Sequence, residues 1–282
     1  LEARANPRIY AVRQPTWEGY QQQELSGQMF QDPELGNVPV EYQDRFTRDP
    51  VRARRDLGAV PSEAVAGYFP PGLAAAAADE EREAPYYMAG PHFWRGTWEG
   101  EQRDKFVFAE SLARRWKPEF KGEPGRQYIM HLDLAATQDR CGIAMGHAER
   151  DKVVMDLMMA VEARDHEGQI EFARVRALIF ELAQELAFNI RLVTVDGWQS
   201  VDTRQILKRH GYRTDLLSVD KDMRAYATLL ELMTTRRLSF WRDELFITEV
   251  EHLELIDGKK VDHGPRHGKD LSDAVAGVCA TL

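Results

Sequence analysis

Four aspartates are the residues of this chain whose types and spacing best suit metal chemistry. Asp133 and Asp196 each end or follow an apolar run, and Asp270 and Asp273 open the last helical pattern. If the four converge, two like charges about 4 Å apart cost roughly 4 kcal/mol at an effective dielectric constant of about 20. Such a cluster must take up protons or bind a cation, and oxygen-only ligands select hard ions such as Mg²⁺ or Mn²⁺. Two such ions bridged by a carboxylate form the usual clamp for in-line attack on a phosphodiester.

Each of these aspartates also has a structural interpretation. Asp133 could cap a turn at the end of its strand, but the run around it is so apolar that a ligand role is favoured. Asp196, which precedes a glycine, could equally belong to a simple turn. Asp270 could be a helix N-cap with Asp273 in the first turn, where carboxylates are favoured anyway. That alternative explains one of the last two acids better than it explains both.

Other polar side chains of the same region are assigned lesser roles. Asp139 is predicted to be a turn residue and Asp202 a helix N-cap. His263 and His267 are predicted to be exposed loop residues rather than ligands. Three basic side chains could contact phosphate, namely Lys221, Arg266 and Lys269. For Trp198, a place in the core is favoured over stacking on a substrate.

The elements that must position these acids lie from residue 127 onward. Short apolar runs predict strands at 128–134, 141–145, 153–161, 191–195, 214–219 and 238–241 and a hairpin over 253–261. Apolar residues at steps of three and four predict helices at 169–187, 203–210, 221–235 and 270–282. Three antiparallel strands followed by alternating helices and strands predict an α/β fold, a mixed sheet with helices on both faces. Ligands of such sheets lie beyond the carboxyl ends of strands, so the first-strand carboxylate and the final helix must share one side.

The N-terminal part is poorly periodic and rich in Pro, Gly, Trp and Arg. We expect a short strand at 9–12, helical stretches on both sides of Pro50 within 41–59, and helices at 73–83 and 105–116. After Pro50, a cluster of arginines is interpreted as a solvated helix face rather than a phosphate or partner contact. The cluster consists of Arg52, Arg54 and Arg55. Residues 117–126 resemble a linker. We therefore expect an irregular N-terminal segment over 1–125 and a folded domain over 126–282.

Composition limits the classes of function. The net charge of −9 argues against a protein that holds nucleic acid by bulk electrostatics, so the isolated chain should bind duplex weakly. The apolar runs are too short to cross a membrane, and no secretory signal pattern opens the sequence. Cys141 and Cys279 sit in apolar segments, lack zinc-type spacing and suit a reducing cytoplasm as small core residues. The first residue is Leu1 rather than Met, which predicts a piece of a longer protein.

Four stretches resemble the nuclease part of the large terminase subunit of tailed bacteriophages. They read MHLDLAATQDRCGIAMG, LVTVDGWQSVDTRQILKRHGY, MRAYATLLELMTTRRLSFW and VDHGPRHGKDLSDAVAGV. They span roughly residues 126–282 in the order of the family. The last is the most specific, because it is a loop that ends in Lys-Asp-x-x-Asp-Ala at the start of the closing helix.

The resemblance implies a ribonuclease-H-like fold close to that of Holliday-junction resolvases. The metal-binding acids of the family match Asp133, Asp196, and Asp270 with Asp273, of which Asp270 is preferred. Asp133 and Asp270 would hold the ion that lowers the pKa of the attacking water, and Asp133 and Asp196 the ion that stabilises the leaving oxyanion. The implied activity is endonucleolytic cutting of concatemeric double-stranded DNA in the host bacterial cytoplasm. The implied partners are the portal protein and the small terminase subunit.

The chain departs from a complete large terminase in one respect. It contains no GxxxxGK[ST] phosphate loop, so we expect no ATP hydrolysis. The N-terminal stretches YQDRFTRDPVRARRDLGAVPS and GYFP resemble the segment after the ATPase core in such subunits, which predicts a C-terminal portion. Two alternatives stay open, namely a junction-resolvase-like nuclease and a non-catalytic docking module of the packaging machine whose acids are structural.

Overall fold

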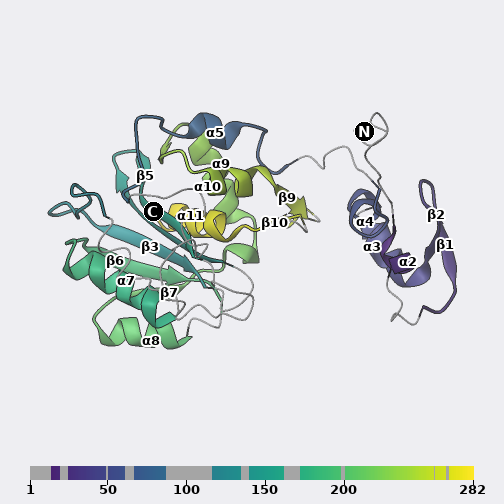
Figure 1. Cartoon of the computed structure of the whole chain (residues 1–282), viewed down its shortest axis with the longest axis horizontal. Coiled ribbons are helices and arrows are strands. Elements are labelled where there is room, and N and C mark those ends of the chain that lie inside the picture. Colours follow the sequence, from purple (N-terminus) through teal and green to yellow (C-terminus); the bar gives the residue numbers. More distant parts are fainter. Residues whose placement is uncertain are drawn as a thin grey trace, which may run out of the picture. The chain divides into compact units, whose positions relative to one another are not determined.

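The computed structural model of the chain contains two compact units, Leu1–Ala66 and Gly67–Leu282 (Figure 1). It describes residues 14–19, 25–48, 50–60, 67–86, 116–134, 140–161, 172–197, 201–256, 258–264 and 267–282. The strand predicted at 9–12 and nearly all of the helix predicted at 105–116 lie outside these residues. So do Asp139, Trp198 and Arg266.

The first unit is a small assembly of short elements. In chain order they are α2 Thr16–Gly19, β1 Met29–Asp32, β2 Gly36–Pro39, η1 Val40–Tyr42, α3 Gln43–Arg48 and α4 Pro50–Asp56. The helices α3 and α4 agree with the helical stretches predicted on the two sides of Pro50. The β1–β2 hairpin was not predicted, because its strands have four residues each and its turn carries no Asn-Gly or Asp-Gly pair. The core of this first unit is built from Val38, Tyr42, Phe46 and Ala53.

The second unit is built on a six-stranded mixed sheet. Its strands are β3 Tyr128–Asp133, β4 Cys141–Glu149, β5 Lys152–Val161, β6 Ile190–Val195, β7 Thr214–Leu216 and β8 Leu238–Ser239. The spatial order is β7-β6-β3-β4-β5-β8. The strands β3, β4 and β5 form an antiparallel meander, whereas β6 runs parallel to β3, β7 parallel to β6 and β8 parallel to β5.

Helices cover both faces of this sheet (Figure 1). One face packs against α7 Phe172–Gln184 and α8 Val201–Arg209. The other packs against α5 Leu73–Ala77, α9 Arg224–Thr234, α10 Glu244–Glu251 and α11 Asp270–Thr281. The predicted α/β class is confirmed, and the arrangement is consistent with the ribonuclease-H-like fold. The described helices include none that is long and apolar enough to cross a bilayer.

Several elements differ from the prediction in extent. The helix α5 ends at Ala77, before the acidic run, and a short hairpin of β9 Leu253–Ile256 and β10 Lys260–His263 occupies the predicted hairpin segment. The helix α10 was not predicted, because acids interrupt its apolar pattern. It begins after Asp243, whose side chain accepts a hydrogen bond from the Phe246 amide at 2.9 Å.

Residues 117–126, whose composition predicts a linker, pack closely against the α7 side of the second unit. Phe120 is buried in the α7-side core beside Trp116, whose indole donates to Glu181 at 2.8 Å. A Cβ on Gly122 would lie 2.2 Å from the Ala187 carbonyl oxygen. The glycine therefore lets this stretch run against the end of α7 rather than only separating two parts of the chain.

Candidate active site

Asp133 and Asp196 lie side by side at the carboxyl ends of two neighbouring parallel strands. Leu132 of β3 pairs with Val195 of β6, and the Asp196 amide donates to the Leu132 carbonyl at 3.1 Å. Gly197 then turns the chain away with φ +70°, a conformation that favours glycine. The two acids that the sequence separates by more than sixty residues are thus neighbours at one edge of the sheet.

The first turn of α11 rests on the strand beside Asp133. Asp133 pairs with Gly142 of β4, and a Cβ on Gly142 would lie 1.9 Å from the Asp270 carbonyl oxygen. Farther along, a Cβ on Gly277 of α11 would lie 2.3 Å from the ring of His131. Because residues two apart in a strand share a face, Asp133 points to the same side as His131 and α11. The condition that the first-strand carboxylate and the final helix share one side is met.

The electrostatics of Asp133 show that all four predicted aspartates interact. Burial and the carboxylates of Asp273, Asp270 and Asp196 raise the pKa of Asp133 to about 9, against the opposing charge of Lys269. The structure therefore brings Asp133, Asp196, Asp270 and Asp273 together from the ends of two strands and the start of one helix. Their role as metal ligands stays a prediction.

Both oxygens of Asp273 have partners within the chain. Its Oδ2 lies 2.9 Å from Lys269 Nζ, and its Oδ1 accepts from the Tyr226 hydroxyl. Burial raises the pKa of Asp273 to about 6, and the pairing with Lys269 and Tyr226 opposes that rise. Lys269 also pairs with Asp220, so its amine is engaged inside the protein rather than presented to a phosphate.

Sequence reasoning missed Glu249 of α10, which lies beside these acids. Its side chain is 2% exposed, and Oε2 accepts from the Ser272 amide at 2.7 Å. Burial and the nearby Asp270 raise the pKa of Glu249 to about 8. The available signal was a glutamate on the apolar face of α10, between the buried residues Phe246 and Val250.

The remaining predicted residues have structural roles. His263 ends β10 with its Nδ1 2.7 Å from the Gly264 oxygen, and His267 stacks on His252 at 3.6 Å between centroids. Both are partly buried, and His263 belongs to a strand rather than a loop, so the prediction of exposed loop histidines is wrong in these respects. Asp202 lies in the first turn of α8 rather than at its N-cap. Lys221 is exposed. Cys141 and Cys279 are buried, which agrees with their prediction as small core residues.

The donor set of Asp133, Asp196 and Asp270 fits a hard divalent cation. The ligand atoms would all be carboxylate oxygens, and the pKa of Asp133 reflects an excess of negative charge that a cation would relieve. As the side chains stand, no three His, Cys, Asp or Glu residues within the described part of the chain form a group ready to hold a metal ion.

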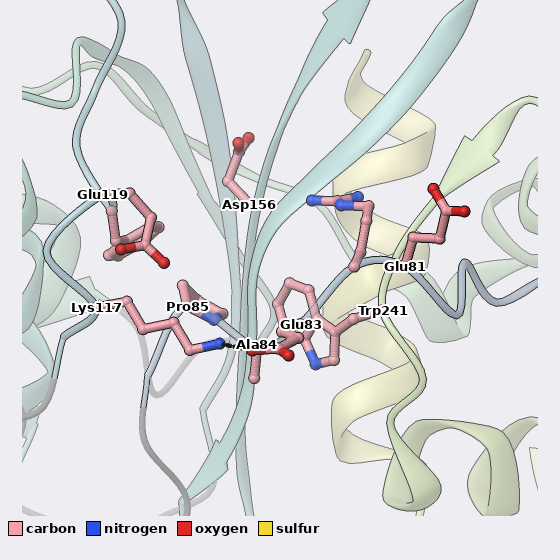
Figure 2. A pocket seen from close by; sticks show the side chains of 10 residues that line it. Glu81, Glu83, Ala84, Pro85, Lys117, Glu119, Asp156 and Trp241 are labelled. Atoms are coloured by element: carbon pink, nitrogen blue, oxygen red, sulfur yellow. Dashed lines mark hydrogen bonds and ion pairs between the residues drawn. The ribbon is translucent and has the colours of Figure 1, made fainter.

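A separate cavity of about 370 Å³ lies beside β5, and its lining includes none of the clustered acids. Figure 2 shows Lys117 directed toward Glu83, while Asp156 projects from β5. Asp156 is met by His147 Nδ1 at 2.6 Å, and Arg82 donates to the Met155 carbonyl at 2.7 Å. Two acids of this cavity, Glu83 and Asp156, thus have charged or basic partners within the chain.

No family model matches the chain, and no curated protein matches it either. The chain is similar to the large terminase nuclease from thermophilic phage G20c, with a TM-score of 0.46 and 14% identity over 56% of this chain and 83% of that chain. It is also similar to the HK97 bacteriophage large terminase, with a TM-score of 0.47 and 15% identity over 58% of this chain and 42% of that chain.

A third likeness is with a large terminase from another thermophilic bacteriophage, in complex with ADP. The TM-score is 0.48 and the identity 10%, over 58% of this chain and 41% of that chain. The chain therefore spans about two fifths of this protein and of the HK97 protein. Structures of the G20c nuclease also hold magnesium or cobalt.

Proposed function

We propose that this chain is a divalent-metal-dependent endonuclease that cuts concatemeric double-stranded DNA as the nuclease of a viral packaging terminase. The observation that carries the proposal is the meeting of Asp133, Asp196 and Asp270 at the carboxyl edge of β3 and β6. The four terminase-like stretches within residues 126–282 support the same conclusion. The portal protein and the small terminase subunit are the partners that this role would require.

Within this function the acids divide into two roles. Asp133, Asp196 and Asp270 would hold Mg²⁺ or Mn²⁺, with Asp133 shared between two ions. Such ions, when bound, polarise a phosphodiester and activate a water for in-line attack. Asp273 positions the first turn of α11 instead, because Lys269 and Tyr226 already engage its two oxygens.

Gly142 contributes by having no side chain. Only a glycine lets the Asp270 carbonyl approach the strand pair that carries Asp133, since any Cβ there would overlap it. The separation between Asp133 and the α11 acids is thus set by backbone contact. A site held by rigid elements in this way needs little rearrangement to present its carboxylates to a cation.

The proposal is tested with Asp133→Asn and Asp196→Asn, which remove one charge each. We expect both variants to lose Mn²⁺ binding in calorimetry and plasmid cutting, while their circular dichroism stays that of the wild type. The control is Asp202→Asn, an acid whose side chain is 71% exposed and pairs with Arg176. It should bind and cut normally.

Two results would contradict the proposal. Wild-type cutting by Asp133→Asn would remove the metal interpretation of the cluster. Failure of the wild-type protein to bind Mn²⁺ would favour the non-catalytic docking module, in which the acids only shape the fold. A preference for four-way junctions over linear duplex would instead assign the same chemistry to a resolvase-like nuclease.

A further inference from the structure

Glu249 is a buried acid that the resemblance does not assign to the site. It projects from α10, an element that carries none of the predicted ligands, and only 2% of it is exposed. A carboxylate removed from water this completely requires partners that compensate its charge. What each of its two oxygens meets therefore indicates what Glu249 does.

One oxygen has a structural role. Glu249 Oε2 accepts from the amide of Ser272, in the first turn of α11, at 2.7 Å. The first amides of a helix have no partner within it, and a carboxylate satisfies them well. Lys269, the N-cap residue of α11, has a side chain that cannot accept a hydrogen bond. Glu249 thus supplies from α10 the cap that α11 lacks locally.

The other oxygen has no such role. Glu249 Oε1 is buried and has no hydrogen-bond partner among the described residues. Arg140 forms an ion pair with it, but the Nη1 atom lies 3.8 Å away, beyond hydrogen-bond distance. The cap therefore accounts for one oxygen of the carboxylate and leaves Oε1 without a hydrogen bond.

Gly268 shows where Oε1 points. A Cβ on Gly268 would lie 3.0 Å from Asp270 Oδ2, 4.0 Å from Glu249 Oε1 and 3.9 Å from Arg140 Nη1. Three charged groups from three segments thus border the same small space, which the glycine leaves open. Two of the three are carboxyl oxygens and one is a guanidinium, so acids outnumber bases around this space.

We propose that Glu249 is a further carboxylate of the metal site, with Oε2 fixing the first turn of α11 and Oε1 adding its charge beside Asp270. The inference rests on the proposed metal-dependent function and extends the ligand set to a segment outside the terminase-like stretches. It also explains why a helix end that carries a predicted ligand is capped by an acid rather than by a neutral side chain.

The test compares Glu249→Gln with Glu251→Gln, an exposed glutamate of the same helix. A glutamine can still accept from the Ser272 amide but carries no charge. We expect Glu249→Gln to keep the melting temperature of the metal-free protein and to weaken Mn²⁺ binding in calorimetry by about tenfold or more. Glu251→Gln should change neither quantity.

A second variant, Gly268→Ala, places a methyl group between Asp270 and Glu249 without touching the cap. It should also weaken Mn²⁺ binding. If Glu249→Gln does not fold, the Mn²⁺ affinity of Gly268→Ala tests the inference instead. Wild-type Mn²⁺ affinity in the folded variants would overturn the inference and leave Glu249 as a helix cap alone. That failure is distinct from failure of the proposed function, in which the wild-type protein itself would bind no Mn²⁺.

Discussion

Two aspartates that each end a strand show how differently one residue type can be used. Asp32 is the last residue of β1 and is 5% exposed. Arg54 holds it with Nε at 2.9 Å from Oδ1 and Nη2 at 2.9 Å from Oδ2, and the amides of Glu34 and Leu35 donate to Oδ1 at 3.0 Å. Burial alone would raise the pKa of Asp32, but these donors lower it below its ordinary value.

Asp133 is the last residue of β3 and has the opposite surroundings. Burial and three further carboxylates raise its pKa to about 9, with Lys269 opposing them. Asp32 is completed by a counter-charge within its own unit and serves the fold. Asp133 sits among like charges, which is a cost to the fold that a bound cation would remove. The comparison separates a structural acid from a candidate functional one by its neighbours alone.

The largest expected effect comes from displacing the helix that crowds Asp133. Gly142→Ala would place a Cβ 1.9 Å from the Asp270 carbonyl oxygen, and backbone cannot yield as a side chain can. We expect a loss of about 3 kcal/mol of unfolding free energy in urea titrations. The matched control is Gly264→Ala, whose Cβ would meet only Glu254 Oε1 at 3.6 Å. Equal stability of the two variants would mean that α11 does not rest on β4.

Much of the sheet could be predicted because its strands are continuous apolar runs. The strands β3, β4, β5 and β6 and the helix α11 lie close to their predicted positions, since burial on one or both faces determines their composition. The helix α10 and the β1–β2 hairpin could not be found in this way. Their stability depends on side-chain caps and turns, such as the Asp243 cap of α10, rather than on periodicity.

The candidate site could be predicted only in part. Asp133 and Asp196 were found because each ends or follows an apolar run, and Asp270 and Asp273 because they open the last helical pattern. The partners of a charge, however, are set by tertiary contacts. Arg54 was interpreted as part of a solvated face, and it pairs with Asp32 instead, twenty-two residues away. Arg55 pairs with Asp56 at 2.6 Å. Glu249 was missed because its closeness to Asp270 arises only when α10 packs beside α11.

The next largest effect should come from removing the paired acid. Asp32→Asn ends the charge-assisted contacts with Arg54, and hydrogen bonds to charged groups are worth about 2 kcal/mol. Because the pKa of Asp32 is lowered in the folded state, its contribution is present above the unfolded value of 3.8 and is lost as the pH falls through the folded value. Hydrogen exchange in peptides from residues 25–60 should quicken at pH 7.

Asp44→Asn provides the control for that experiment, because Asp44 is an exposed acid in α3 of the same unit. Its exchange should match that of the wild type. If Asp32→Asn also matched the wild type, Asp32 would contribute no more than a surface acid, and the contrast with Asp133 would disappear.

The last expected effect has the opposite sign and belongs to Asp133→Asn in the metal-free protein. The folded state raises the pKa of Asp133 to about 9, so between pH 4 and that value it binds a proton more tightly than the unfolded chain does. The contribution of Asp133 to stability therefore falls as the pH rises through this window. Removing the group should therefore stabilise the metal-free protein at pH 8.

Thermal unfolding with a chelator at pH 5 and pH 8 measures this difference, which should be larger at the higher pH. With Mn²⁺ in excess the order should reverse, because a ligand that binds only the folded wild type raises its stability with concentration. A variant that is less stable than the wild type at pH 8 without metal would place Asp133 with Asp32 among the structural acids. A reversal on adding Mn²⁺ would instead show that the crowding around Asp133 is relieved by the cation, as the difference between the two strand ends predicts.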